Sequence, residues 1–229
     1  FSSSYAQIEK FEFSDKTLTL TQLTQDGFEL HGTDADETIW GWNGKNIIYG
    51  EDGNDTIYGS SKEDVLNGGK GDDKLYGNDG SDTLIGGAGN DYLEGGTQGD
   101  TYVFAKGHGQ DAVYDYSYGV EGDDTVRFTD IASTEVKFRK NGSNLTVFGY
   151  NGDDSVTIKD FFSSSYARIE HFEFQDGILS NPDFARFSQM ANNLGQAMSV
   201  FGVQAVSSEN SNAPADLSTK PILTLSPLS

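Results

Sequence analysis

The stretch GGKGDDKLYGNDGSDTLIGGAGNDYLE, residues 68–94, decides the fold because it repeats one formula three times at intervals of nine residues. The formula is Gly-x-x-Gly-x-Asp-x-Leu-x. The same register runs back to Gly32 and forward to Val103, which gives eight units without a gap. A fixed short period of this kind predicts a solenoid, in which each unit is stable only when it stacks on its neighbours.

Three positions of the unit are held in register. Position one is Gly in all eight units. Position six holds Glu37, Asn46, Asp55, Asp64, Asp73, Asp82, Asp91 and Asp100. Position eight holds Ile39, Ile48, Ile57, Leu66, Leu75, Leu84, Leu93 and Tyr102. The sequence therefore predicts a short strand in every unit, with one inward apolar side chain that stacks into a continuous ladder.

The acidic and glycine positions together indicate a metal-binding turn. Glycine leaves the backbone carbonyls uncovered, and carboxylate and carbonyl oxygens are the ligands that Ca²⁺ takes. No thiolate or imidazole recurs at any position, which makes zinc and copper poor candidates. The candidate metal-ligating residues are Asp55, Asp64, Asp73, Asp82, Asp91, Asp100, Gly50, Gly53, Gly68, Gly71, Gly77, Gly80, Gly86, Gly89 and Gly95. Glu37, Asn46 and Asp111 are weaker candidates.

The charge of the chain favours cations as partners. Its 229 residues contain 36 acidic and 15 basic side chains, a net charge of −21, which excludes nucleic acid and anionic membranes as natural partners. Residues 32–103 alone hold 15 acidic and 4 basic side chains, a net charge of −11. Such a segment has the composition of a disordered chain unless a metal neutralises it. The chain has no Cys, so a disulfide framework is excluded.

The eight units resemble the RTX (repeats-in-toxin) haemolysin-type calcium-binding repeats of Gram-negative bacteria. An isolated Gly/Asp-rich stretch is typical of a solvated loop, whereas eight units in register favour an ordered repeat. The resemblance implies an all-β fold, a parallel β-roll, in which two units complete one coil and ions lie between turns of units two apart. It pairs Asp55 with Asp73, Asp73 with Asp91, Asp64 with Asp82, and Asp82 with Asp100.

These pairs imply about four calcium sites, and six or more if the weaker candidates contribute. Lys62 and Gln98 replace the position-four glycine of their units, so we expect weaker sites there. The resemblance also implies a module of a large secreted bacterial protein that is disordered at low calcium and folds on binding calcium outside the cell. Its expected partners are calcium ions and the type I secretion machinery.

Residues 104–180 are predicted to form a β-rich domain that caps the open end of the roll. Their hydrophobic residues alternate with polar ones, and KNGSN, residues 140–144, predicts a hairpin turn. Degenerate units surround Asp111, Asp124 and Asp154. The region resembles the haemolysin-type calcium-binding-related segment that follows RTX blocks.

The two ends of the chain carry further signals. FSSSYAQIEKFEFSD, residues 1–15, recurs as FSSSYARIEHFEFQD at 162–176, so we interpret residues 1–31 as the end of a preceding module in a longer parent with tandem copies. Residues 181–229 are expected to begin with a short helix and end in a tail that resembles a type I secretion signal. The helical spacing comes from Phe184, Phe187, Met190, Leu194, Met198 and Phe201.

Catalytic motifs such as GxSxG or HExxH do not occur, so enzyme activity is not expected in this segment. His31, His108 and His171 are expected to be turn or surface residues. The alternative function is a surface module for carbohydrate or a host receptor, located on an aromatic stripe. The sequence favours strand-face packing for these aromatic residues, which are Trp40, Trp42, Tyr49, Tyr58 and Tyr76.

Overall fold

The computed structural model of the chain describes residues 10–12, 17–19, 27–116, 122–163 and 169–180, and within these the chain forms strands and turns but no helix. The helix expected after Asn181 and the tail that ends at Ser229 lie outside the described residues. The chain separates into one unit of residues Phe1–Ile178 and a second of Leu179–Ser229. Among the described residues, no helix has the length and apolar character needed to cross a membrane.

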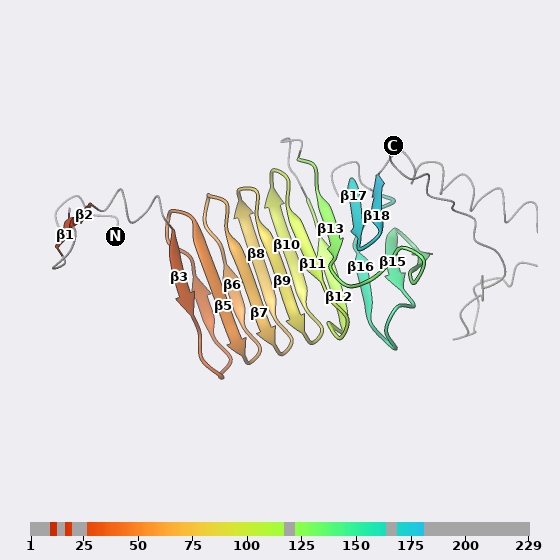
Figure 1. Cartoon of the computed structure of the whole chain (residues 1–229), viewed down its shortest axis with the longest axis horizontal. Coiled ribbons are helices and arrows are strands. Elements are labelled where there is room, and N and C mark those ends of the chain that lie inside the picture. Colours follow the sequence, from red (N-terminus) through yellow and green to blue (C-terminus); the bar gives the residue numbers. More distant parts are fainter. Residues whose placement is uncertain (1–9, 13–16, 20–26, 117–121, 164–168, 181–229) are drawn as a thin grey trace, which may run out of the picture. The chain divides into compact units, whose positions relative to one another are not determined.

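The first unit is built on two eight-stranded sheets between which the chain alternates (Figure 1). One sheet contains β3 (Phe28–His31), β5 (Asn46–Asp52), β7 (Val65–Lys70), β9 (Thr83–Ala88), β11 (Thr101–Phe104), β13 (Thr125–Phe128), β17 (His171–Phe174) and β18 (Gly177–Ser180). The other contains β4 (Thr38–Trp40), β6 (Thr56–Tyr58), β8 (Lys74–Asp79), β10 (Tyr92–Thr97), β12 (Gln110–Tyr114), β16 (Ser155–Ile158), β15 (Asn144–Phe148) and β14 (Lys137–Asn141).

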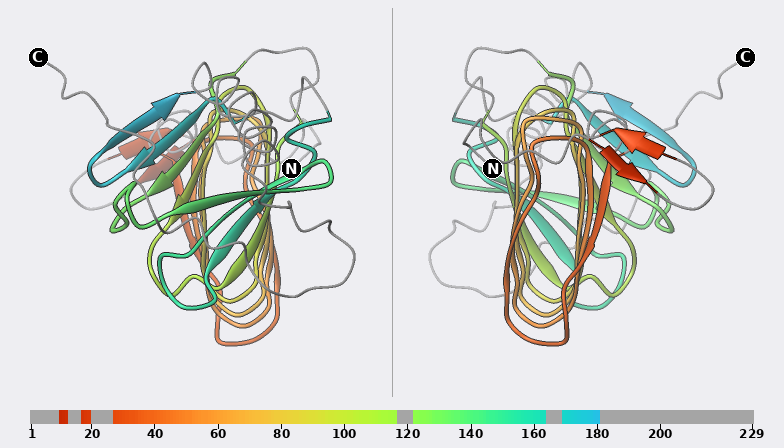
Figure 2. Two further views of the ribbon diagram at one scale, coloured as in Figure 1. Left: turned by 90° about the vertical axis from the view of Figure 1, so that its right-hand side faces the viewer. Right: turned by 90° about the vertical axis from the view of Figure 1, so that its left-hand side faces the viewer.

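Each nonapeptide supplies one strand, and two nonapeptides complete one coil. Ile57 pairs with Leu75 across parallel strands β6 and β8, and Ile48 pairs with Leu66 across β5 and β7, so the register between coils is 18 residues. Seen along the roll, successive coils lie one behind another (Figure 2). The predicted parallel β-roll is therefore confirmed.

The core is the ladder of position-eight side chains between the two sheets. From Ile48 to Tyr102 every one of them is fully buried. Ile39 is the exception and is partly exposed, because β4 is an edge strand with a neighbour on one side only. A single apolar column therefore supplies the centre of each coil.

The stacking continues past residue 103. Leu93 pairs with Val113 in β12, and Val113 pairs with Ile158 in β16, so the apolar ladder runs on with longer connections. The order then changes, because β14 and β15 form an antiparallel hairpin in which Asn141 pairs with Asn144, and β15 runs antiparallel to β16. The hairpin predicted at KNGSN is confirmed, and it covers what would otherwise be a parallel strand edge.

The two copies of the repeated sequence, residues 1–15 and 162–176, both contain strands. β1 (Lys10–Glu12) and β2 (Thr17–Thr19) form an antiparallel pair in the first copy. The equivalent residues of the second copy lie in β17 and β18, which are neighbours in the first sheet. The 161-residue repetition therefore preserves local structure as well as residue identity.

Two neighbouring isoleucines test the position-eight ladder. Ile48 is fully buried, whereas Ile47 is 38% exposed on the outer face of the same strand. We expect Ile48→Ala to cost about 2–5 kcal/mol of unfolding free energy because it leaves a cavity in the ladder. Ile47→Ala should cost less than about 1 kcal/mol. Urea unfolding in saturating calcium measures both, and equal effects would contradict the inward assignment of position eight.

Candidate calcium sites

The position-six side chains form two hydrogen-bonded columns, one along each edge of the roll, which we call the carboxylate ladders. In each ladder the backbone N–H of one turn donates to a carboxylate oxygen of the equivalent turn in the next coil. The first ladder joins Glu37 to Asp55 (2.8 Å), Asp55 to Asp73 (2.7 Å), Asp73 to Asp91 (2.8 Å) and Asp91 to Asp111 (2.9 Å). The second joins Asn46 to Asp64 (2.6 Å), Asp64 to Asp82 (2.7 Å), Asp82 to Asp100 (2.8 Å), Asp100 to Asp124 (2.7 Å) and Asp124 to Glu170 (3.0 Å).

All four Asp pairs expected from the sequence are thus brought together. Each of these Asp side chains uses Oδ1 for the ladder bond, which leaves Oδ2 for another partner. Within the described residues, Oδ2 is buried without any hydrogen-bond partner in Asp55, Asp73, Asp82, Asp91 and Asp100. A buried ionised oxygen without a donor is costly, so each of these oxygens needs a proton or a cation.

Burial and neighbouring negative charges raise the pKa values of these carboxyl groups. Burial raises the pKa of Asp73 to about 6, that of Asp82 to about 7, and those of Asp91 and Asp100 to about 8. The ladder N–H groups oppose this shift and neighbouring carboxylates add to it. Burial also raises the pKa of Asp55. At neutral pH the metal-free turns are therefore a poor environment for the charge that the sequence places there.

The glycines stand where a side chain would collide with these oxygens. A Cβ built at Gly50 would lie 2.5 Å from Oδ2 of Asp55 and 2.5 Å from the carbonyl oxygen of Gly68. Gly71 has a φ of 123° and faces the backbone of Gly53 in the preceding coil. Of the nine predicted glycines, five lie within strands β5, β7, β8, β9 and β10, namely Gly50, Gly68, Gly77, Gly86 and Gly95, and four directly follow strands, namely Gly53, Gly71, Gly80 and Gly89. Position one is therefore confined to glycine by contact with the carboxylate of its own unit.

Two units that depart from the formula also depart in their contacts, whereas the unit with Gln98 keeps the free Oδ2 of Asp100 found in the regular units. Oδ2 of Asp64, in the unit that contains Lys62, accepts the backbone N–H of Ser60 at 2.5 Å. Glu37 Oε2 likewise accepts the N–H of Thr33 at 2.6 Å. Backbone donors thus satisfy oxygens that are left free in the regular units, which is the physical reason to expect weaker cation binding at these turns.

Asn46 fills its turn with an amide nitrogen. Its Nδ2 donates to the carbonyl oxygens of Trp42 (3.0 Å) and Gly44 (2.7 Å) and to Oδ1 of Asp64 (2.8 Å). Carbonyl and carboxylate oxygens such as these are the ligands that Ca²⁺ takes. The side-chain amide of Asn46 therefore supplies the hydrogen-bond donor to these oxygens.

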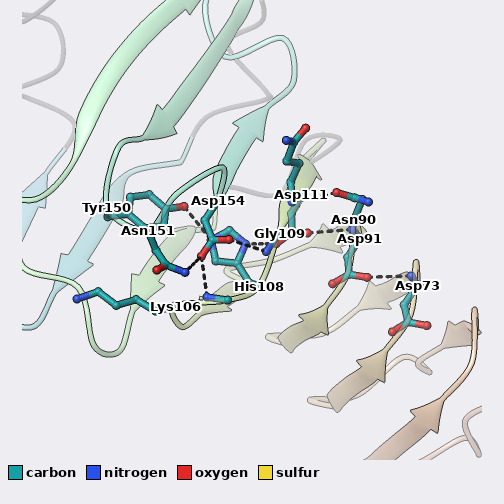
Figure 3. Close-up of polar contacts among 12 residues, drawn as sticks. Asp73, Asn90, Asp91, Lys106, His108, Gly109, Asp111, Tyr150, Asn151 and Asp154 are labelled. Atoms are coloured by element: carbon teal, nitrogen blue, oxygen red, sulfur yellow. Dashed lines mark hydrogen bonds and ion pairs between the residues drawn. The ribbon is translucent and has the colours of Figure 1, made fainter. Parts of the chain in front are cut away.

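The first ladder ends at Asp111, whose side chain contacts His108. Nδ1 of His108 lies 2.6 Å from Oδ2 of Asp111, and Nε2 of His108 lies 2.8 Å from the Tyr150 hydroxyl (Figure 3). His108 was expected to be a turn or surface residue; it directly follows a turn at residues 106–107, but it is only 3% exposed, so a surface position is wrong. The sequence could not show this because Tyr150 is 42 residues away. His31, with an exposed side chain between Glu29 and Glu51, lies at the surface as expected.

Sequence reasoning missed two acidic residues of the second ladder, Asp124 and Glu170, and the buried Asp115. Asp124 was recognised in a degenerate unit but not assigned as a ligand. Glu170 lies two residues before the buried Phe172, which is the spacing of Asp and Leu in the regular units, so this signal was available. Asp115 follows β12, is fully buried, and belongs to no recurring spacing.

The five aromatic residues of the proposed stripe do not form one surface. Trp40, Tyr58 and Tyr76 stack along the second sheet with ring centroids 4.0 and 4.9 Å apart. Tyr49 lies on the first sheet and stacks on His31, while Trp42 packs against Phe28. The grouping of all five residues is therefore wrong, because consecutive units contribute strands to different sheets.

Comparisons with known proteins identify the repeats and the segment that follows them. Residues 31–66, 58–93 and 67–102 match the RTX calcium-binding nonapeptide repeat, and residues 144–179 match the haemolysin-type calcium binding protein related domain. The iron-regulated protein FrpA of Neisseria meningitidis serogroup C is 45% identical over 97 residues. That match covers 42% of this chain and 8% of FrpA, so it spans less than a tenth of its relative.

Among solved structures, the AlgE6R3 subunit of the Azotobacter vinelandii mannuronan C5-epimerase is similar, with 23% identity and a TM-score of 0.35. The match covers 55% of this chain and 71% of that one.

The raised pKa values predict that low pH stabilises the metal-free roll. Because the carboxyl pKa values of the folded chain lie above those of the unfolded chain, the metal-free fold binds more protons and loses stability as the pH rises from about 4 to about 8. Calcium requires the deprotonated groups, so its affinity should rise over the same interval. Circular dichroism in chelator should therefore show more β-sheet signal at about pH 5 than at about pH 8. Equal signals at the two pH values would contradict these shifts.

Proposed function

We propose that this chain, which carries RTX haemolysin-type calcium-binding repeats, is a calcium-dependent folding module of a large secreted bacterial protein. The observation that carries the proposal is the set of five buried Asp Oδ2 atoms that have no donor among the described residues. A cation between successive turns supplies the missing partner to each of them. The chain is then disordered at low calcium and folds when it meets calcium outside the cell.

The energy available from calcium is of the right size for such a switch. With a dissociation constant near ~10⁻⁴ M, typical of extracellular modules, millimolar calcium adds about 1.4 kcal/mol per site. Four sites then add about 5–6 kcal/mol, which is comparable with the whole stability of a small domain. In a cytosol, where calcium is far scarcer, the same term nearly vanishes. Folding therefore follows the compartment.

Export through a secretion channel fits a chain that is disordered at low calcium. RTX repeat proteins are typically secreted by Gram-negative bacteria, and the chain carries such repeats. A segment with a net charge of −11 stays extended without its ions and can enter a narrow channel. We assign the type I secretion machinery as the partner of the tail, residues 205–229, and the extracellular space or cell surface as the destination.

Binding of carbohydrate or a host receptor is the second function considered for this surface. The stack of Trp40, Tyr58 and Tyr76 is the feature that bears on it. Its rings lie within 12° of parallel, so Tyr58 is covered on both faces by its neighbours. Sugar stacking needs a free ring face, and the contacts therefore favour packing along the strands for the centre of this stack.

A calcium titration followed by circular dichroism tests the folding proposal. We expect the full chain to gain β-sheet signal at millimolar calcium. Asp73→Asn should raise the calcium midpoint severalfold, because it removes the charge of a ligand shared by two sites of one edge. Asp72→Asn is the matched control, since Asp72 is an exposed neighbour with the same charge. A chain that is as ordered in chelator as in calcium would refute the proposal.

Deletion of residues 205–229 tests the assignment of the tail. The described roll ends before this segment, so calcium-induced folding in vitro should be unchanged. Export from a host that carries a type I system should fall to background. Measured secretion equal to that of the full chain would remove the tail from the mechanism and leave calcium-driven folding in place.

A further inference from the structure

Strand β1 lacks a neighbour that the equivalent strand of the second copy has. β17 lies between β13 and β18 in the first sheet (Figure 1). β1 and β2, in contrast, form a sheet of only two strands within the part of the chain that the structure describes. An isolated two-stranded hairpin is only marginally stable in water. The edge of β1 that corresponds to the β13 side of β17 is therefore without a strand partner among the described residues.

The second copy shows which contacts this edge can make. β17 runs parallel to β13, with Val126 opposite Phe172 and Arg127 opposite Glu173. Phe172 is fully buried, and the guanidinium group of Arg127 donates to the carboxylate of Glu173. Backbone pairing, one buried ring and an ion pair across the strands thus hold β17 on β13.

Further contacts extend this interface beyond the strand itself. Phe174 stacks on Phe128, with ring centroids 5.3 Å apart and an interplanar angle of 8°. The carboxylate of Asp176 accepts the backbone N–H of Ser133 at 2.7 Å and the hydroxyl of the same residue at 3.0 Å. The interface therefore continues into the turn between β17 and β18.

The residues that make these contacts are shared by the two copies. At the offset of 161 residues, Glu170, Phe172, Glu173, Phe174 and Asp176 correspond to Glu9, Phe11, Glu12, Phe13 and Asp15. Residues 1–15 and 162–176 differ only at Gln7 and Arg168, Lys10 and His171, and Ser14 and Gln175. The printed bond of Gln175 in this interface comes from its backbone N–H, which any residue type other than proline provides. The first copy therefore keeps the residue types that bind a strand such as β13.

The equivalent strand of this roll is not available to β1. Both edges of β13 are occupied here, by β11 on one side and by β17 on the other. β3 has no strand neighbour on its outer side among the described residues, but it carries Glu29 and neither lysine nor arginine. It offers Glu12 no counterpart of Arg127, and like charges opposite each other destabilise a strand pair. A free edge of the β13 type must therefore come from another roll.

We propose that β1 and β2 close the first sheet of a second roll of the same kind, in which β1 pairs in parallel with the strand equivalent to β13. That strand presents an arginine to Glu12 and an apolar side chain to Phe11, as Arg127 and Val126 do for the second copy. Addition of a strand to an exposed sheet edge is a general mode of recognition, in which backbone bonds give affinity and side chains give specificity. Only eight residues, 20–27, separate β2 from β3, so the two rolls follow each other without a further domain between them.

Exchange of the two copies within the full chain tests the fit. The sequence of residues 1–19 is placed at positions 162–180, and circular dichroism and urea unfolding are measured in saturating calcium. We expect the β-sheet signal and the urea midpoint of the unchanged chain to be retained. The control carries a Gly-Ser sequence of equal length at 162–180 and should unfold at lower urea, because β13 becomes an open edge and Phe128 loses a stacking partner. An exchanged chain no more stable than this control overturns the inference.

The Gly-Ser chain also tests association between copies, since its β13 edge is free and its residues 1–19 are unchanged. We expect sedimentation velocity in calcium to show concentration-dependent oligomers that the unchanged chain does not form. Phe11→Ala should abolish them. Glu12→Arg should weaken the association severalfold, and Arg127→Glu in the same chain should restore it, because the double change pairs opposite charges again.

Two results of this second experiment overturn the inference. One is a Gly-Ser chain that keeps its β-sheet signal in calcium and stays monomeric. The other is association that survives Phe11→Ala, which would assign the contact to a different edge, such as that of β3. If the Gly-Ser chain does not fold in calcium, the exchange experiment decides alone.

Discussion

The roll depends on one interaction, the bond from the backbone N–H of a turn to the carboxylate of the turn one coil further on. This bond fixes the 18-residue register, because each position-six Asp reaches only the turn directly beside it. The same geometry buries the other oxygen of the side chain without a donor. The group that aligns the coils therefore also leaves a buried oxygen that needs a proton or a cation. The alignment of the coils and this need have a single origin.

The two columns that specify the fold could be read from the sequence because each follows from a contact within the nine-residue period. Position eight is apolar since Leu75 or Leu84 meets the equivalent side chain of both adjacent coils. Position one is glycine since a Cβ would meet the carboxylate of its own unit. Both rules act between residues a fixed distance apart. The period thus predicted stacked strands with an inward apolar ladder, and the resemblance to RTX repeats implied the parallel β-roll and its Asp pairs.

The end of the roll was not predictable in the same way. The ladder step is 18 residues within the repeats, but it is 20 from Asp91 to Asp111, 24 from Asp100 to Asp124 and 46 from Asp124 to Glu170. There the alignment is set by strand pairing and not by a constant spacing. The burial of His108 and of Asp115 was overlooked for this reason. Their partners lie in other strands and turns at distances in the sequence that no period contains.

A solenoid of acidic turns has two problems where it stops, an open strand edge and a final carboxylate. The antiparallel hairpin of β14 and β15 deals with the edge of the second sheet. The first ladder ends on His108, which Tyr150 holds from the other side. Tyr150 comes from the capping segment, so that segment completes the hydrogen-bonded end of the first ladder. The second ladder ends on a further acid, Glu170, whose Oε2 accepts the N–H of Asp124. The two edges of one roll therefore end in different side chains, a histidine at one edge and a glutamate at the other.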